Sequence, residues 1–293
     1  MLEVTACPIC GGHRLSHYLE TRDYHLTNEE FILKRCEDCD LIVTSPRPDT
    51  EWLMGYYASD DYISHTSSAT NLVSQAYLLA RRYTLRHKLG LVEQFAPKGR
   101  LLDFGCGTGE FLKCAQTKHW DTYGVEPAEK PRKAAQHELS NIHPDVASIP
   151  SKDLQAITLW HVLEHIPQLN EILIQLKERL SEAGTIFIAV PNVKSYDSRH
   201  YGPQWAGLDV PRHLWHFSQQ NMIRLLQNHH LKWVHTLPMK LDAYYVSLLS
   251  EKYRSHNRLS VSAVYKAIRS GLKSNMEARR STEYSSLIYV ARK

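Results

Sequence analysis

The stretch that decides the fold is residues 101–111, which read LLDFGCGTGEF. A short apolar run carries an acid, Asp103, and leads directly into Gly-x-Gly-x-Gly and the start of a helix. Closely spaced glycines let the backbone turn sharply and let a ligand approach where a Cβ atom would clash. The first turn of the following helix offers unpaired N–H groups. The pattern therefore predicts a strand, a ligand-binding turn and a helix in succession.

The alternation of strands and helices continues beyond this stretch. A helix is expected over Leu169–Leu180, closed by Gly184, because glycine commonly ends helices. Alternating strands and helices predict a parallel sheet covered by helices on both faces. Residues 242–280 are predicted to form a helical insertion before the last strand. The predicted strands are Leu101–Phe104, Thr122–Val125, Ala156–Trp160, Thr185–Val190, Leu231–Leu237 and Ser285–Val290.

A second acid follows at the end of the next predicted strand. Glu126 lies 21 residues beyond Gly105, and in doubly wound sheets an acid there accepts hydrogen bonds from ribose hydroxyls. The glycine spacing differs from the Gly-x-Gly-x-x-Gly of pyrophosphate binders, and Asp103 suits an ammonium group better than a phosphate. S-adenosylmethionine, with a ribose, a cationic amino group and no pyrophosphate, fits these residues. The alternative is a tight structural turn followed by a solvated glutamate.

Four of the six cysteines, Cys7, Cys10, Cys36 and Cys39, form two Cys-x-x-Cys pairs separated by 25 residues. Two such pairs supply the four thiolates of a tetrahedral structural zinc site, which leaves no open position for catalysis. A module of about 45 residues buries too little apolar surface to fold alone, so a metal ion explains its stability. The alternative is two pairs of free thiols, or disulfides, without metal.

Ser-Pro-Arg-Pro at residues 45–48 favours an extended connection after this module. We therefore predict three parts along the chain. They are a zinc-ribbon module over 1–48, a helical linker or cap over 49–95, and an α/β domain over 96–293.

The composition of the 293 residues excludes several classes of protein. Hydrophobic residues make up 43% and charged residues 23%, as in ordinary globular chains, which excludes a disordered protein. No apolar run reaches the roughly 18 residues that a membrane span needs, and the N-terminus lacks the basic and apolar regions of a secretory signal. A cytoplasmic location is therefore expected, where paired cysteines more often bind metal than form disulfides. The net charge, 35 − 31 = +4, does not by itself imply a nucleic-acid partner.

Residues 100–190 resemble the class I S-adenosylmethionine-dependent methyltransferases. The motifs that carry the resemblance are LLDFGCGTGEFL, YGVEP, ITLWHVLEHIP and GTIFIAVPN. The resemblance implies a Rossmann-like seven-stranded methyltransferase sheet, with the cofactor over its carboxyl edge and a final antiparallel strand pair. Residues 1–48 resemble the zinc-ribbon extension found ahead of some methyltransferase domains, including the Ser-Pro-Arg-Pro after the second cysteine pair.

The resemblance also implies roles for particular residues. Asp103 and the loop glycines would line the methionine end of the cofactor, and Glu126 would bind the ribose. Cys106 is interpreted as a small filler of the loop, because the sequence positions no base to activate its thiol. The predicted cofactor-binding residues are Asp103, Gly105, Cys106, Gly107, Gly109, Glu126, Pro127, Trp160 and His161, and the predicted zinc ligands are Cys7, Cys10, Cys36 and Cys39.

Two histidines are candidates for catalytic chemistry. His161 follows a strand at the carboxyl edge, where ligands bind in open α/β sheets. Its neighbours Glu164 and His165 are interpreted equally well as residues that cap or brace the following helix. His213 lies in a Pro-x-His-Leu segment before Phe-Ser that resembles one in relatives of the ubiquinone-type methyltransferases, and it would take a proton from an acceptor hydroxyl. The equally weighted alternative is that this segment supports the cofactor pocket.

These observations predict an S-adenosylmethionine-dependent methyltransferase that acts on a small-molecule acceptor, with O-methylation favoured. An RNA or protein acceptor is the alternative, because residues 251–293 hold ten Lys/Arg against three Glu, a local excess of +7. These basic residues are scattered, which argues against a nucleic-acid partner. A third alternative is a non-catalytic cofactor-binding protein. The sequence predicts neither the acceptor nor the oligomeric state.

Overall fold

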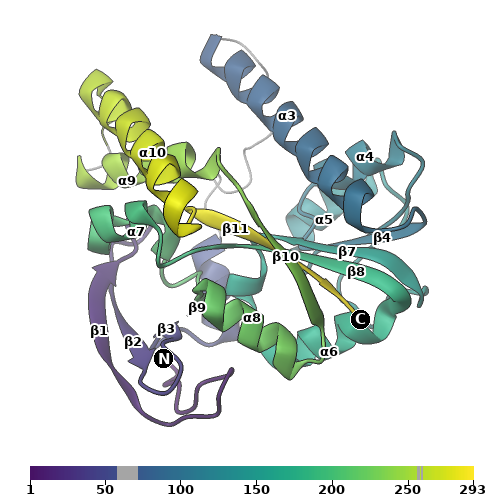
Figure 1. The fold of residues 1–293 in the computed structure, drawn as a ribbon, viewed down its shortest axis with the longest axis horizontal. Coiled ribbons are helices and arrows are strands. Elements are labelled where there is room, and N and C mark those ends of the chain that lie inside the picture. Colours follow the sequence, from purple (N-terminus) through teal and green to yellow (C-terminus); the bar gives the residue numbers. More distant parts are fainter. Residues whose placement is uncertain (58–71, 256–257, 259) are drawn as a thin grey trace.

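The computed structural model describes residues 1–57, 72–255, 258 and 260–293, and its largest element is a seven-stranded mixed sheet (Figure 1). The strand order is β10–β11–β8–β7–β4–β5–β6. The five strands from β8 to β6 in this order run parallel, while β11 is antiparallel to both of its neighbours. The predicted Rossmann-like sheet is therefore confirmed. Its strands are β4 (Arg100–Phe104), β5 (Asp121–Val125), β6 (Ile142–His143), β7 (Leu154–Trp160), β8 (Leu180–Pro191), β10 (Lys232–Pro238) and β11 (Ser286–Arg292).

All six predicted strands are present in this sheet, and the seventh, β6, has only two residues, too few for an alternating pattern. The prediction that Gly184 closes a helix is wrong. The helix α6 ends at Arg179, and Gly184 lies inside β8. A Cβ atom on Gly184 would lie 2.7 Å from the carbonyl oxygen of Leu154, so the glycine permits close approach of the neighbouring strand β7.

Helices cover both faces of the large sheet (Figure 1). In β8, Ile186, Ile188 and Val190 pack with α6 and α8, while Phe187 and Ala189 pack with α3 and α4. Successive side chains of a strand point to opposite faces, so a continuous apolar run is buried on both sides. The covering helices are α3 (Leu72–Phe95), α4 (Glu110–Gln116) and α5 (Glu129–Gln136) on one face, and α6 (Leu169–Arg179) and α8 (Gln219–Asn228) on the other.

A second sheet, with the order β1–β2–β3–β9, joins the N-terminal residues to the rest of the chain. Its first three strands come from residues 1–48, but β9 comes from the segment after β8 and pairs with β3. The predicted module over 1–48 thus shares a sheet with the remainder, and the three-part division stays a prediction. The strands are β1 (Leu15–Arg22), β2 (Glu30–Cys36), β3 (Ile42–Thr44) and β9 (Trp215–His216).

Asparagine side chains attach the two cysteine loops to helices of the large sheet. Asn228 Nδ2 donates a hydrogen bond to the Ile9 carbonyl at 2.6 Å, and Asn221 Nδ2 donates to the Cys39 carbonyl at 2.7 Å. Both asparagines lie on α8. Since buried carbonyl groups need partners, the positions of the cysteine loops depend on residues far along the chain.

Two helical regions complete the fold. The predicted linker or cap contains α1 (Thr50–Leu53), η1 (Met54–Tyr57) and α3, while its residues 58–71 lie outside the described part. The predicted helical insertion is confirmed as α9 (Asp242–Arg254) and α10 (Val261–Ser281), between β10 and β11. No described helix combines the length and the apolar character that crossing a bilayer requires. The remaining short helices are η2 (Leu163–His165), α7 (Tyr196–Tyr201), η3 (Gly202–Gln204) and η4 (Ala206–Leu208).

Candidate active site and cysteine cluster

The glycine loop after β4 and the acid after β5 meet at the carboxyl edge of the sheet. The Gly107 N–H donates to Glu126 Oε2 at 2.9 Å, and the Ala128 N–H donates to Glu126 Oε1 at 2.9 Å. Burial raises the pKa of Glu126, and these two backbone hydrogen bonds oppose the rise. The structure therefore brings together the loop and the second acid that the sequence singled out.

The loop glycines have different structural roles, although all three have positive φ. A Cβ atom on Gly105 would lie 2.5 Å from Val162 Cγ2, and one on Gly109 would lie 2.4 Å from Leu139 Cδ1. These two glycines are required by packing. At Gly107, by contrast, no atom of the described residues lies within 4 Å of the Cβ position. The space for a ligand is thus at Gly107.

Asp103 lies beside this space, near the end of β4. Its side chain is buried, and the Thr158 hydroxyl donates to Asp103 Oδ1 at 2.6 Å. Burial raises the pKa of Asp103 to about 7, although the Thr158 hydrogen bond and the Lys88 charge oppose the rise. Asp103 and Glu126 interact electrostatically, so both acids contribute to the same edge.

Lys88, on α3, is a residue of the site that sequence reasoning missed. Its Nζ lies 4.7 Å from the centre of the Trp160 ring. Burial lowers the pKa of Lys88, and the carboxylates of Asp242 and Asp103 oppose the fall. The ammonium group thus adds positive charge close to Asp103. Nothing in the sequence of α3 marks this lysine, because its partners come from β4, β7 and α9.

The other predicted cofactor neighbours differ in exposure. Cys106 is buried, and a Cβ atom on Gly124 would lie 2.8 Å from its Sγ, so the sulfur fills space against β5. Burial raises the pKa of Cys106, which agrees with an unreactive thiol. Pro127 is exposed at the rim. Trp160 packs edge-on against Phe111, with 5.4 Å between ring centres.

His161 lies between two carboxylates. Its Nε2 is 2.9 Å from Asp242 Oδ2, and its Nδ1 is 3.5 Å from Glu164 Oε1. Although burial disfavours its charged form, the hydrogen bond to Asp242 and the neighbouring Glu164 raise the pKa of His161 to about 9. At neutral pH the imidazole is therefore protonated, and in this arrangement it holds α9 against the end of β7.

His213 is buried in the segment that precedes β9. Its Nδ1 donates to the Gly207 carbonyl at 2.9 Å, and its Nε2 lies 3.9 Å from both Glu164 Oε1 and Asp209 Oδ2. The His165 ring centre is 4.5 Å from the His213 ring centre. Glu164 and His165 lie in η2, and α6 begins without a side-chain cap, so neither residue caps that helix.

Arg212 fixes the segment that carries His213, and its partners were not expected from the sequence. The side chain is 1% exposed. Arg212 Nη2 donates to Asp23 Oδ1 at 2.8 Å and to Asp209 Oδ1 at 2.7 Å. Although burial acts in the opposite direction, the Arg212 charge holds the pKa of Asp209 at about 2. This buried ion pair joins the N-terminal residues to the site.

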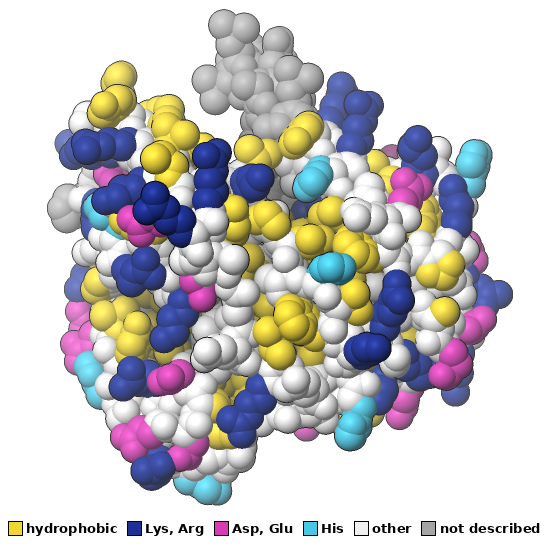
Figure 2. Space-filling model, in the orientation of Figure 1, with side chains coloured by type: hydrophobic (Ala, Val, Ile, Leu, Met, Phe, Trp, Pro, Cys, Tyr) yellow, Lys and Arg dark blue, Asp and Glu magenta, His cyan; other side chains and the backbone are white. Residues whose placement is uncertain are grey.

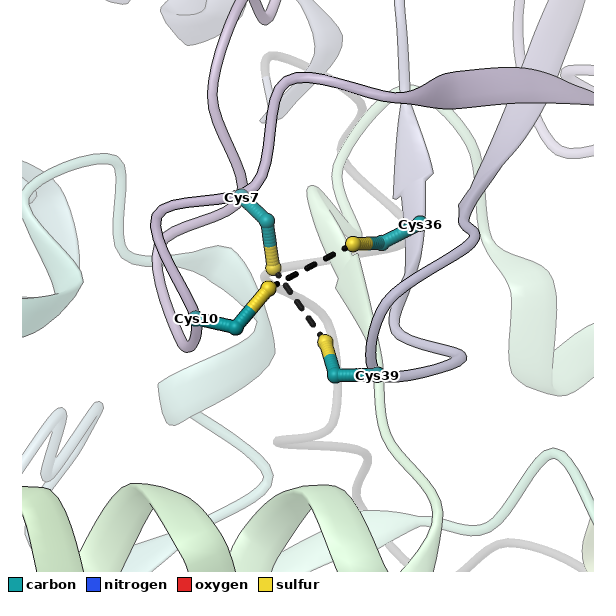
Figure 3. Close-up of side chains that lie close together, drawn as sticks. All are labelled: Cys7, Cys10, Cys36 and Cys39. Carbon is teal, nitrogen blue, oxygen red and sulfur yellow. Dashed lines mark hydrogen bonds between the residues drawn. The ribbon is translucent and has the colours of Figure 1, made fainter.

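The four cysteines of the N-terminal pairs converge, with their sulfur atoms pointing toward one another (Figure 3). Cys7 Sγ lies 3.4 Å from Cys39 Sγ, and Cys10 Sγ lies 3.5 Å from Cys36 Sγ. These thiols are free. The sulfur atoms around a tetrahedral zinc ion lie about 3.8 Å apart, so the cluster needs little adjustment to hold one.

The sequence matches a family model described as a methyltransferase domain, over residues 77–236. This match covers more than half of the 293 residues and includes the glycine loop, both acids and His213. A search of curated protein sequences gave no match.

Solved structures of methyltransferase-like proteins share the fold. The cyclopropane synthase MmaA2 from Mycobacterium tuberculosis has a TM-score of 0.52 and 12% identity, over 85% of this chain and 100% of that chain. Geranyl diphosphate C-methyltransferase from Streptomyces coelicolor A3(2), in complex with Mg²⁺, geranyl diphosphate and S-adenosyl-L-homocysteine, has a TM-score of 0.51 and 11% identity, over 77% and 87%. The chain therefore belongs to the methyltransferase-domain family and has the fold of the class I S-adenosylmethionine-dependent enzymes, preceded by a four-cysteine cluster.

Proposed function

We propose that the protein transfers a methyl group from S-adenosylmethionine to a hydroxyl group of a small molecule. The observation that carries the proposal is the edge formed by Glu126, Gly107 and Asp103. One buried carboxylate accepts a hydrogen bond from the glycine loop, a second lies beside it, and the Gly107 Cβ position borders open space. A ribose and an ammonium group are the chemical groups that two such acids bind.

Each part of the edge has a proposed role toward the cofactor. Glu126 accepts hydrogen bonds from the ribose hydroxyls, and Asp103 binds the ammonium group of the methionine end. Lys88 lies close to Asp103 and supplies a positive charge for the carboxylate of that same end. Trp160 borders the cofactor, and Cys106 fills the loop. When bound, the cofactor supplies an electrophilic methyl group.

The acceptor is proposed to bind between this edge and His213. The lone pair on His213 Nε2 faces Glu164 and Asp209, because Nδ1 is occupied by the Gly207 carbonyl. His213 is therefore the proposed base for an acceptor hydroxyl. His161, protonated and paired with Asp242, is assigned a positioning role, and in-line alignment of the reacting groups supplies much of the rate.

The four cysteines are proposed to hold one structural zinc ion. Four thiolates complete its coordination and leave no position for a substrate. The convergence of four free sulfur atoms on one point supports this assignment. The ion would stabilise the loops that rest on α8.

Calorimetry with S-adenosylhomocysteine tests the cofactor site. Glu126→Gln is expected to weaken binding at least about tenfold, which corresponds to roughly 1.4 kcal/mol. Glu129→Gln is the matched control, because Glu129 lies three residues away, is exposed and forms an ion pair with the exposed Lys133. Equal affinities for wild type and Glu126→Gln would contradict the proposal. Turnover of a pooled set of hydroxylated metabolites then identifies the acceptor.

A second candidate is an anionic acceptor such as RNA. An open groove of about 520 Å³ between α7, α9 and α10 is lined by Arg254, Lys266, Arg269 and Lys273. Figure 2 shows Lys and Arg side chains on the α9–α10 side of this face, with hydrophobic side chains among them. Binding of single-stranded RNA that weakens with salt and is lost in Lys266→Glu would favour this candidate. Absence of RNA binding at low salt would exclude it.

A further inference from the structure

A second group of metal-ligand side chains lies outside the cysteine cluster. Glu164 and His165 come from η2, directly after β7, and His213 comes from the segment ahead of β9. One ligand atom from each lies within 4.8 Å of the other two. Ligand atoms that bind one ion with bonds of about 2.1 Å lie roughly 3 to 3.5 Å from one another. Small side-chain movements would therefore bring the three ligand atoms onto one ion.

Glu164 is the residue that points to a bound cation. Its side chain is 1% exposed, and neither carboxylate oxygen has a hydrogen-bond partner among the described residues. Two histidines lie within ion-pair distance of Oε1: His161 Nδ1 is 3.5 Å away and His213 Nε2 is 3.9 Å away. The protonated His161 offsets part of the Glu164 charge, but Asp242 lies closer to the same imidazole, at 2.9 Å, so the two carboxylates share one cation. Buried charges in proteins are paired or coordinate metals, and a second cation beside Glu164 would complete the pairing.

Both histidines direct a lone pair away from the backbone. His213 Nδ1 lies 2.9 Å from the Gly207 carbonyl, and His165 Nδ1 lies 3.1 Å from the Arg212 carbonyl. A carbonyl oxygen only accepts, so in each ring Nδ1 carries the proton and Nε2 is unprotonated in the neutral form. The Tyr57 hydroxyl, 2.9 Å from His165 Nδ1, is compatible with this tautomer. A backbone carbonyl bound to the second ring nitrogen is the usual support of a metal-ligating histidine.

We propose that Glu164, His165 and His213 bind one divalent transition-metal ion, through the Glu164 carboxylate and the two Nε2 atoms. Two imidazoles and one carboxylate favour ions such as Zn²⁺, Mn²⁺ or Fe²⁺ over Mg²⁺ and Ca²⁺, which prefer oxygen ligands. Asp209 is not counted as a ligand, because both of its oxygens accept hydrogen bonds from Arg212.

Three protein ligands leave coordination positions open, in contrast to the four-cysteine cluster. With the ion bound, His213 Nε2 is a ligand and is no longer available as the base, so the ion would take over that role. An acceptor hydroxyl bound to the ion would lose its proton to solvent more easily, since a metal ion lowers the pKa of a bound oxygen. This role of the ion rests on the proposed function. The binding of the ion does not, because it depends only on the three side chains and their supports.

The test is calorimetric titration of the full-length protein with ZnCl₂, without cofactor or acceptor, after one equivalent of zinc has been bound by the cysteines. Wild type is expected to bind one further equivalent. Glu164→Gln and His213→Gln should each weaken this second event at least about tenfold. X-ray absorption at the zinc edge should then show nitrogen and oxygen ligands in addition to sulfur.

His216→Gln is the matched control. His216 is buried three residues from His213, but its Nε2 is 3.0 Å from the Thr44 hydroxyl and lies outside the three-residue group. This variant should retain the second equivalent. Circular dichroism and S-adenosylhomocysteine affinity report whether each variant is folded. If His213→Gln does not fold, the test depends on the isosteric variant Glu164→Gln.

Three results would overturn the proposal. They are a wild-type protein that binds no zinc beyond the first equivalent, a second event unchanged in Glu164→Gln, and a second event weakened equally in His216→Gln. The first result would mean that the protonated His161 balances the Glu164 charge without a metal ion. Retention of the second equivalent in a protein that binds no S-adenosylhomocysteine would contradict the proposed function and leave the metal site standing.

Discussion

Among the residues that the structure describes, two groups of side chains have the chemistry of metal ligands, and they differ in how they are assembled. Cys7, Cys10, Cys36 and Cys39 come from two short motifs on neighbouring loops of one small sheet. Glu164, His165 and His213 come from opposite ends of a long excursion that includes β8 and α7. The first group follows from local spacing, whereas the second exists only because the end of β7 lies against the segment before β9.

The two groups also differ in the charge that remains on their side chains when no metal ion is bound. A thiol that lacks a metal ion can take up a proton and become uncharged, and burial raises the pKa of Cys7 to about 11. The Glu164 carboxylate does not lose its charge in this way. Its neighbours are histidines, and neither oxygen has a hydrogen bond among the residues that the structure describes. Protons can therefore replace the metal ion in an empty cysteine cluster, whereas Glu164 in an empty histidine–glutamate group depends on His161, a cation that it shares with Asp242.

The largest expected effect concerns the cysteine cluster. Cys36→Ser removes one ligand and should lower the free energy of unfolding of the zinc-loaded protein by about 5 kcal/mol, in the range typical of a lost structural metal. Cys114→Ser is the control, because Cys114 lies on α4, outside the cluster, and should change stability by less than about 1 kcal/mol. Urea unfolding measures both. Equal effects would show that the cluster holds no structural ion.

Arg212→Met should have the next largest effect. The variant leaves Asp23 and Asp209 without their cation, and breaking a buried ion pair from one side costs about 3 kcal/mol or more. It should also weaken the second zinc-binding event, because Arg212 positions the segment that carries His213. The exposed pair Arg199–Glu277 supplies the control, and Arg199→Met should cost less than about 1 kcal/mol. Unchanged urea midpoints for both variants would contradict the assigned role of Arg212.

The buried residues Glu126 and Glu164 can be compared directly, with smaller expected changes in the free energy of unfolding. In protein stripped of metal, Glu126→Gln should lose about 1.5 kcal/mol, because its carboxylate accepts two backbone N–H bonds. Glu164→Gln should cost less, since no such hydrogen bonds are lost and His161 keeps its 2.9 Å contact with Asp242. Chelator-treated samples followed by urea unfolding give both values. A larger loss for Glu164→Gln would mean that the histidines alone already stabilise that charge.

The smallest effect is a pH dependence of cofactor binding. The pKa of Asp103 is raised to about 7 by burial, so its carboxylate is largely ionised at pH 8 and largely protonated at pH 6. An ammonium group binds the ionised form, and affinity should therefore fall as the pH falls through 7, by up to about tenfold per unit. Calorimetry with S-adenosylhomocysteine checks this slope. Asp103→Asn should bind weakly at every pH, and a slope that persists in this variant would assign the titration to another group.

Much of the fold could be predicted because its signals are local. Strands β4, β5, β7 and β8 are apolar runs, and the glycine loop marks the turn after β4. The misses have physical reasons. β6 and β9 have two residues each, and Gly184 has the chemistry of a helix end but serves a close strand contact.

The candidate site was predicted in part for the same reason. Asp103, Gly107 and Glu126 occupy strand ends, and parallel strands bring their carboxyl ends to one edge. Lys88 has no such signal, since a lysine on a long helix is ordinarily solvated. Arg212 was visible within its segment, but its partner Asp23 is 189 positions away in the sequence.

The sequence by itself determined six strands of the large sheet, the glycine loop, the two acids and the four-cysteine spacing, because each depends on residues close together in the chain. Only the tertiary structure decided that β9 completes the N-terminal sheet, that the Lys88 charge lies near Asp103, and that Glu164, His165 and His213 come together. Burial and the distances between charged groups produce these arrangements, and both quantities are set by how distant segments pack.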